Sequence, residues 1–246
     1  MTRRHRIFTD QELQPGQVVT LADEAAHYLS RVLRLGAGQA VVVFNGDGSD
    51  YAVEVSEMGR ATIRLQLAGR LPAAAESPLR IVLIQAVSRG ERMDWSLQKA
   101  TELGVSGVQP VFTARTEVRL SADRTEQRMK YWRKVIISAC EQSGRACVPA
   151  LLAPVDVLQW AQQASQAQRI MLTPGAAPLA CPSPALDVEL LVGPEGGLDE
   201  RELDFMDRQG ILAASLGPRI LRTETAGPAA IAILQALAGD MADRQL

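Results

Sequence analysis

The chain has 246 residues, 47% of them apolar, and a formal net charge of -2. This length and composition allow a substantial core, which excludes a disordered protein and permits one large domain or two smaller ones. No apolar run approaches the roughly 18 residues of a membrane span, and the basic first residues lead into no apolar segment of a secretory signal. We therefore expect a soluble cytoplasmic protein.

The three cysteines are Cys140, Cys147 and Cys181. They lack the paired spacing that a zinc site needs, and their odd number argues against a disulfide framework. We expect ordinary small apolar residues in a reducing compartment, and no metal site.

Charge is unevenly distributed along the chain. Between residues 80 and 145, twelve basic residues stand against seven acidic ones, an excess of about five positive charges, whereas residues 156–202 lean acidic. A basic face for a polyanion and a solvated surface of mixed charge both fit this pattern. The basic residues are Arg80, Arg89, Arg92, Lys99, Arg115, Arg119, Arg124, Arg128, Lys130, Arg133, Lys134 and Arg145.

The first 72 residues have the pattern of a small β-rich domain. Residues 41–48 form an apolar run that ends in Asn-Gly and Asp-Gly turns, and residues 51–67 continue with period-two alternation. Before them, residues 23–36 show helical spacing, with Asp23 as an N-cap and Gly36 as a stop signal. The pattern predicts a small barrel or sandwich over residues 1–72. Residues 71–78, with two prolines, have the composition of a linker.

Residues 73–246 alternate between strand and helix patterns, which is typical of an α/β domain with a largely parallel sheet. Short apolar runs predict strands over residues 79–87, 105–113, 169–174, 187–194 and 211–218. Apolar residues at helical spacing predict helices over residues 91–104, 123–144, 154–164 and 223–241.

Three predicted strand ends are candidate walls of one pocket, because open α/β sheets bind ligands at the carboxyl ends of their strands. They are residues 172–174, 193–197 and 216–225. The glycines of the Gly-Pro-Glu-Gly-Gly loop at 193–197 would let a ligand approach the backbone closely. A tight turn between strand and helix, with no ligand, is the simpler explanation for the same glycines. Asp199, Glu200 and Glu202 follow it and oppose a phosphate, so a neutral or cationic ligand is favoured.

The segment from Leu216 to Ile233 places Arg222 at a strand-to-helix junction beside this pocket. Thr223 or Thr225 can cap the following helix, and capping would explain the two threonines without any ligand. A charge at such a junction normally needs a partner, and this favours a functional role for Arg222.

Five motifs in order resemble the RsmE-type 16S rRNA uridine-N3 methyltransferases of the SPOUT superfamily. Their order along nearly the whole chain makes the resemblance specific. They are RIF at 6–8 with HYLSRVLRLGAGQ at 27–39, SRGERMDWSLQKATELGV at 88–105, ACEQSGR at 139–145, GPEGG at 193–197 and LGPRILRTET at 216–225.

This resemblance implies a PUA-like β-barrel RNA-binding domain over 1–72 and a SPOUT methyltransferase domain with a C-terminal trefoil knot over 73–246. It also implies bound S-adenosylmethionine, a homodimer and 16S rRNA of the small ribosomal subunit as substrate. The sulfonium of that cofactor is cationic, in agreement with the acidic loop. The implied cofactor residues are Leu172, Gly193, Glu195, Gly196, Leu216, Gly217, Ile220, Leu221, Arg222, Thr223 and Thr225.

For catalysis we rank Arg222 above Glu195 and Glu224, since a cation can stabilise a developing uridine anion. The chain departs from the family pattern at Thr173, at Cys147 and at Gly227-Pro228. Pro228 is tolerable if it falls in the first helical turn.

Basic residues of both domains are candidates for RNA contacts. They are Arg6, Arg31, Arg34, Arg89, Arg92, Lys99, Arg115 and Arg145. The aromatic residues Phe8, Tyr28 and Trp95 fit core or interface positions better than base-stacking platforms.

Three alternatives remain open at this point: a catalytically silent knotted RNA-binding protein, a methyltransferase for a different rRNA or tRNA nucleotide, and a nucleotide-dependent oxidoreductase or kinase. The last is disfavoured by the absence of a Gly-Lys-Ser/Thr or Gly-x-Gly-x-x-Gly motif.

Overall fold

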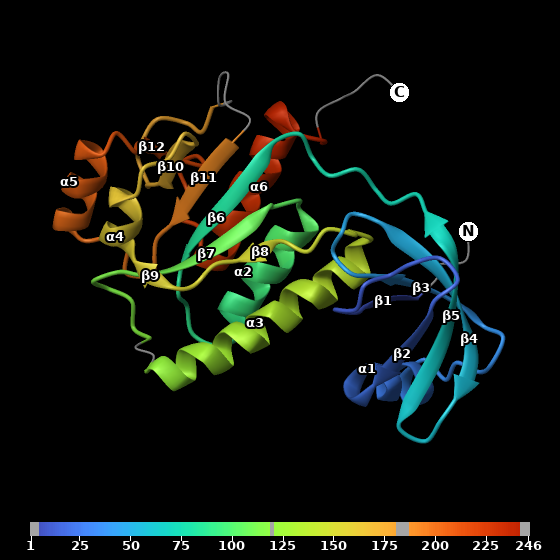
Figure 1. Ribbon diagram of the computed structural model, residues 1–246. Helices are drawn as coiled ribbons and strands as arrows, with labels where there is room; N and C mark the ends of the chain where they lie inside the picture. The colour runs from blue at the N-terminus through green and yellow to red at the C-terminus, as the bar shows by residue number, and fades with distance from the viewer. Residues whose placement is uncertain (1–4, 119–120, 181–186, 242–246) are drawn as a thin grey trace. The chain divides into compact units, whose positions relative to one another are not determined.

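The computed structural model describes residues 5–118, 121–180 and 187–241 (Figure 1). Arg119 and Cys181 lie outside these ranges. The chain forms two compact units, one that ends at Ala75 and also contains Cys140–Val148, and one built from Glu76–Ala139 and the residues from Pro149 onward. The division falls a few residues after the boundary suggested by the sequence. The sequence did not indicate that Cys140–Val148 belongs to the first unit.

The first unit contains one five-stranded sheet with the order β1-β3-β4-β5-β2. Its strands are β1 (Arg6–Phe8), β2 (Val18–Ala22), β3 (Ala40–Phe44), β4 (Asp50–Met58) and β5 (Thr62–Leu71). β1 pairs with β3 in parallel, and the other pairs are antiparallel. All five strands contribute to a single apolar core. Within the described residues no pairing joins β1 to β2, so hydrogen bonds do not close the predicted barrel.

The predicted helix over residues 23–36 is shorter than expected and changes type. It consists of α1 (Asp23–His27) followed by a π-helical turn, η1 (Tyr28–Val32), in which the Leu33 N–H donates to the Tyr28 carbonyl at 3.0 Å. The segment ends before Gly36, because Arg34 takes a positive φ of 53°. Such a widened turn is rare. Here it accompanies complete burial of Leu29 in the core of the first unit.

The half-buried Arg6 joins Cys140–Val148 to β1. Arg6 forms an ion pair with Asp50, donates to the Arg145 carbonyl at 2.9 Å and stacks over the Phe44 ring at 4.8 Å. The Phe8 N–H donates to Glu141 Oε1 at 3.0 Å. These contacts combine opposite charges with satisfied backbone groups, as buried charges require.

The second unit confirms the predicted α/β architecture with a parallel sheet. The strand order is β12-β10-β11-β6-β7-β8, and β9 also pairs with β7. All the strand pairs that the structure describes in this sheet are parallel. The strands are β6 (Arg80–Ala86), β7 (Gly107–Phe112), β8 (Ala150–Leu151), β9 (Val155–Asp156), β10 (Gln168–Leu172), β11 (Asp187–Val192) and β12 (Leu212–Ala214).

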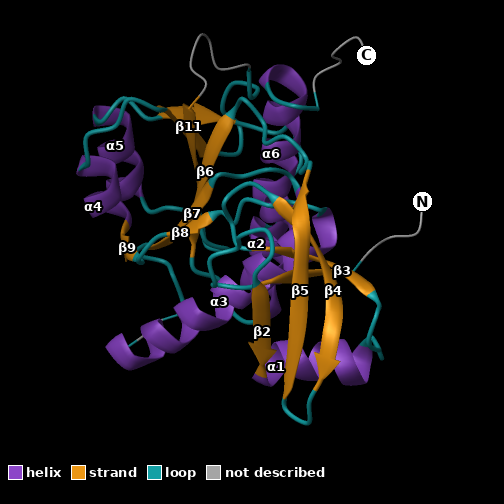
Figure 2. Cartoon of the chain, turned by 45° about the vertical axis from the view of Figure 1, so that its right-hand side comes forward, coloured by secondary structure: helices purple, strands orange, loops and turns teal. Residues whose placement is uncertain are grey.

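Helices cover both faces of this sheet (Figure 2). On one face, Ile84 and Leu191 pack against α4 (Val157–Gln162) and α5 (Glu200–Arg208). On the other, α6 (Thr223–Ala238) packs against α2 (Glu91–Glu102) and places Gly227 against the sheet, where an added Cβ would lie 3.6 Å from Leu83. The long helix α3 (Ala122–Ser143) follows β7. Buried strands covered on both faces explain the near-continuous apolar runs of the sequence.

Pro228 does not lie in the first turn of its helix, so the condition under which the sequence made it easily tolerated is not met. α6 begins at Thr223, so Pro228 is inside the helix. At this position a backbone N–H would donate to the carbonyl four residues earlier, and proline has none to give. The Glu224 carbonyl is therefore left without its helical donor.

We predict that Glu141→Gln stabilises the first unit increasingly as the pH rises from about 4. Burial raises the pKa of Glu141 above its ordinary value of 4.5, against the opposing effects of the Phe8 N–H and Arg6. A carboxyl whose pKa is raised by folding costs stability as the pH rises through its titration range, whereas glutamine has no charge to bury and still accepts from Phe8. Urea unfolding from pH 4 to 8 measures the difference.

Glu126→Gln, on the exposed face of the same helix, is the matched control. A hydrogen bond from Lys130 lowers the pKa of Glu126, so its replacement should lose stability relative to the natural protein as the pH rises. Parallel pH dependences of the two variants would contradict the assignment.

Candidate active site

A cavity of about 560 Å³ lies at the carboxyl ends of β10, β11 and β12. The three loops predicted from the sequence all line it, with residues 172–174, 192–198 and 214–226 each contributing. They meet there because parallel strands present their carboxyl ends at one edge of the sheet. Volumes of this size hold small ligands with their surface largely buried.

A short turn and a helix cap shape the loop at 193–197. The Gly197 N–H donates to the Pro194 carbonyl at 2.9 Å, with Gly197 at a positive φ of 69° that favours glycine. Asp199 then caps α5 by accepting from the Glu202 N–H, and the Glu202 side chain accepts from the Asp199 N–H. This reciprocal capping box satisfies the first N–H groups of the helix, so the helix start offers little to a phosphate.

The loop after β7 holds the same glycine-rich segment from the other side. Glu202 is buried and also accepts the Ala114 N–H at 2.7 Å. Arg115 donates to the Gly196 carbonyl at 2.9 Å and to the Leu198 carbonyl at 3.4 Å. Arg115, assigned to RNA contacts from the sequence, therefore has a positioning role toward the loop.

The cavity carries both signs of charge, which corrects the acidic character inferred from the sequence. Arg92 Nη1 donates to Glu195 Oε1 at 2.9 Å, and this hydrogen bond raises the pKa of the arginine. Both side chains line the cavity, together with Arg219, Arg222 and Glu224. Arg92, which the sequence placed among RNA contacts, thus belongs to the cavity wall.

Neither predicted threonine caps α6. Arg222 is the N-cap residue, and it makes no side-chain capping hydrogen bond. The buried Thr223 instead directs Oγ1 toward Ser88 Oγ at 3.4 Å and Glu224 Oε2 at 3.3 Å. The capping explanation is therefore wrong, and the hydroxyl belongs to the site.

The predicted cofactor residues lie at the cavity except for Gly196 and Thr225, which are not among its lining residues. Gly196 lies against Arg115, and the Thr225 N–H donates to the Arg222 carbonyl. Thr173, one of the departures from the family pattern, lines the cavity with a buried Oγ1 that lacks a hydrogen-bond partner among the described residues. Arg219 lies within the motif at 216–225 but was not assigned to the cofactor, and Ser215 and Leu198 were missed because each lies just outside a motif.

The predicted RNA residues fall into distinct environments. Arg31 and Arg34 are exposed. Arg89 pairs with Glu117 at 3.3 Å, and Lys99 pairs with Glu102 and lies 5.0 Å from the centre of the Trp95 ring.

Arg145 is buried and Arg6 is largely covered within the first unit, so neither belongs to an open basic surface as the sequence suggested. Of the aromatic residues considered, Phe8 packs edge to face on Phe44, whereas Tyr28 and Trp95 are 42% and 52% exposed.

Cys140 and Cys147 are thiols rather than the two halves of a disulfide, and Cys140 Sγ donates to the Cys147 carbonyl at 3.6 Å. In the part of the chain that the structure describes, no group of three or more His, Cys, Asp or Glu side chains could hold a metal ion. No helix among the described residues is long and apolar enough to cross a membrane.

Two family models match the chain. The RNA methyltransferase domain matches residues 75–235, and the RNA methyltransferase PUA domain matches residues 21–67. The parallel sheet with its cavity, together with the preceding β-sheet unit, thus defines an RNA methyltransferase with a PUA domain.

Full-length relatives identify the family. The ribosomal RNA small subunit methyltransferase E of Buchnera aphidicola from Schizaphis graminum is 33% identical, over 96% of this chain and 97% of its own length. A structure of the enzyme of that name from Neisseria gonorrhoeae, bound to S-adenosyl methionine, has a TM-score of 0.90 at 36% identity and covers 97% of this chain and 99% of its own. A putative methyltransferase from Legionella pneumophila with bound SAM reaches 0.92 at 37% identity, over 97% and 100%. The chain belongs to the ribosomal RNA small subunit methyltransferase E family.

We predict that Glu202→Ala destabilises the second unit by about 2 kcal/mol, because one substitution removes a helix-capping group and leaves the Ala114 N–H unpaired. Thermal and urea unfolding measure the loss. Glu200→Ala, an exposed neighbour in the same helical turn, should cost no more than about 0.5 kcal/mol. Equal effects of the two substitutions would refute the role of the Glu202 carboxylate.

Proposed function

We propose that this protein transfers the methyl group of S-adenosylmethionine to N3 of a uridine in 16S rRNA of the small ribosomal subunit. The observation that supports this most directly is the cavity at the carboxyl ends of β10, β11 and β12, walled by the two family motifs at 193–197 and 216–225. The relatives with bound cofactor share this fold over nearly their whole length.

The residues of the cavity fit S-adenosylmethionine. Leu172, Val192 and Leu221 supply apolar surface for an adenine ring, and Thr173 Oγ1, unpaired among the described residues, offers a hydrogen bond within it. The amino acid end of the cofactor carries a carboxylate and two positive charges, so the presence of both arginine and glutamate in the wall is complementary. Leu216, Gly217, Ile220 and Thr223 complete the proposed binding set.

The route of the chain supports a trefoil knot. After the edge strand β12, the segment 215–222 passes the carboxyl ends of β10 and β11 to reach α6, which packs on β6 and β11 (Figure 1). The loop after β10 and the loop after β11 line the same cavity as this segment. We propose that the last segment threads between them, as in the SPOUT superfamily.

The cofactor supplies an activated methyl group, and the chain has to align the acceptor with it at near-attack distance. Neutral uridine carries a proton on N3. Arg222 is exposed at the cavity and makes no ion pair with another described residue, so its charge is available to stabilise the uridine anion. Glu224 lines the same wall and is the candidate proton acceptor, whereas Glu195 is engaged with Arg92 and orients it.

The remaining partners follow from the same proposal. The PUA unit contacts rRNA through exposed residues such as Arg31 and Arg34, and the protein acts as a homodimer in the cytoplasm, where ribosomal subunits are assembled.

A catalytically silent RNA-binding protein, or an enzyme for a different rRNA or tRNA nucleotide, is the alternative. Mass spectrometry of small-subunit rRNA from a deletion strain, with and without the restored gene, separates these cases. Absence of a restored N3-methyluridine would overturn the proposal.

We predict that Arg222→Ala lowers kcat by roughly 100- to 1000-fold, the usual cost of removing a group that stabilises charge in the transition state. Arg222→Lys keeps the charge but loses the planar donor geometry, and should fall between the alanine variant and the natural protein. Methyl transfer to undermodified small subunits at saturating cofactor measures kcat. Near-normal turnover of the alanine variant would remove Arg222 from the catalytic residues.

A further inference from the structure

A second cavity, of about 670 Å³, lies beyond the carboxyl ends of β6 and β7, between the start of α2 and α3. The motif at 88–105 supplies Ser88 and Arg89 to its wall, but no motif marked the contribution of α3. Its wall combines Ser88, Arg89, Arg124, Arg128 and Tyr131 with a single acidic residue, Glu117. Three arginines against one glutamate make it a strongly basic cavity.

The second cavity adjoins the cofactor cavity through a pair of hydroxyl groups. Ser88 lines the second cavity and Thr223 lines the first, and their side-chain oxygens lie 3.4 Å apart. Both side chains are buried. The two cavities are therefore adjacent at these two side chains.

The charges of this cavity are available to a ligand. Arg124 and Arg128 lie four residues apart on α3, on the same side of the helix, and are exposed. Neither forms an ion pair with another residue that the structure describes. Arg89 pairs with Glu117, but both side chains are more than 60% exposed, so the pair is weak and exchangeable.

The cavity also presents an aromatic ring. Tyr131 is 45% exposed, and its hydroxyl donates to Asp94 Oδ2 at 2.8 Å, which fixes the orientation of the ring. Arginines that lack an acidic partner bind phosphates, and an exposed ring stacks on a base. This combination is characteristic of sites for single-stranded RNA.

We propose that the second cavity binds the RNA strand beside the target uridine, with Arg124 and Arg128 on a phosphate and Tyr131 against a base. The inference rests on the proposed function, since it makes this cavity the acceptor side of the same reaction. It adds a substrate subsite on α3 that holds the flanking nucleotide while Arg222 serves the reacting base. The alternative occupant, a second copy of this chain, is an outcome of the test.

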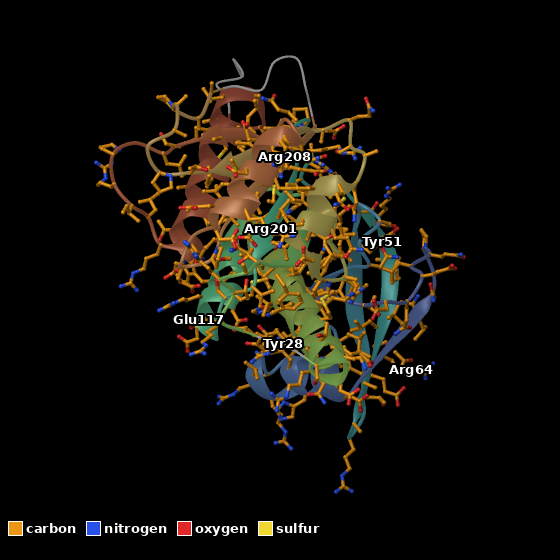
Figure 3. The ribbon with its side chains drawn as sticks, turned by 90° about the vertical axis from the view of Figure 1, so that its left-hand side faces the viewer. Tyr28, Tyr51, Arg64, Glu117, Arg201 and Arg208 are labelled. Carbon is orange, nitrogen blue, oxygen red and sulfur yellow. The ribbon has the colours of Figure 1, made fainter. Side chains whose placement is uncertain are left out.

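The test is the double variant Arg124→Gln/Arg128→Gln, compared with Arg201→Gln/Arg208→Gln. The control removes two arginines from α5, outside the second cavity; both are labelled in Figure 3. Methyl transfer to undermodified small subunits gives kcat and KM, calorimetry gives S-adenosylmethionine affinity, and RNA binding is measured against salt concentration. Sedimentation reports the oligomeric state.

We expect KM for subunits to rise roughly tenfold in the α3 variant, with kcat and cofactor affinity within about twofold of the natural protein. The slope of log affinity for RNA against log salt concentration should become shallower by about 0.7 for each phosphate that the variant no longer neutralises. The control should match the natural protein. An unchanged KM and salt dependence, a loss confined to kcat, or a changed oligomeric state would each overturn the subsite. Failure of the natural protein itself to bind the cofactor or methylate subunits would instead overturn the proposed function.

A second pair of variants tests the ring independently of charge. Tyr131→Phe keeps the ring but loses the bond to Asp94, and should retain KM within about twofold. Tyr131→Ala removes a stacking surface, and should raise KM roughly tenfold without altering cofactor affinity. Equal KM values for the two variants would exclude stacking on Tyr131.

Discussion

Parallel pairing of β6, β7, β10, β11 and β12 is the constraint on which the site depends. The carboxyl ends of parallel strands lie at the same edge of the sheet. The loops that leave these ends therefore lie side by side. Here that edge carries two cavities, one at β10 to β12 and one at β6 and β7. The proposed donor and acceptor sides of methyl transfer are thus neighbours because of sheet topology.

A buried carboxylate gives this edge its rigidity. Glu202 caps α5 and at the same time accepts the Ala114 N–H, so the loop after β7 and the loop after β11 share one anchor. Arg115 adds hydrogen bonds to the carbonyls of Gly196 and Leu198. A glycine-rich loop is otherwise costly to order, because glycine loses the most backbone entropy on folding. Cross-loop hydrogen bonds offset that cost and hold the wall in one conformation.

The distribution of arginines explains how one surface can serve two ligands. Arg92 is neutralised by Glu195 at the cofactor cavity, whereas Arg124 and Arg128 at the second cavity form no ion pair with any residue that the structure describes. An arginine in an ion pair holds the cavity wall in place, whereas an arginine without an acidic partner attracts a phosphate. In the first unit, Arg6 of a family motif is likewise paired, with Asp50.

The sequence by itself determined the α/β class, the parallel strands and the three loops of the cavity, since apolar periodicity and glycine placement are local properties. It also pointed to the family, because five motifs, among them those at 193–197 and 216–225, stand in order along the chain. Only the tertiary structure decided that Cys140–Val148 joins the first unit, that Arg115 holds a loop, that Pro228 lies inside α6 and that Arg124 and Arg128 meet Ser88 at one cavity. Each of these depends on packing between segments distant in the chain, as between Ala114 and Glu202, which are 88 positions apart. No local pattern encodes such a pairing, because its energy arises only when the two segments are brought together.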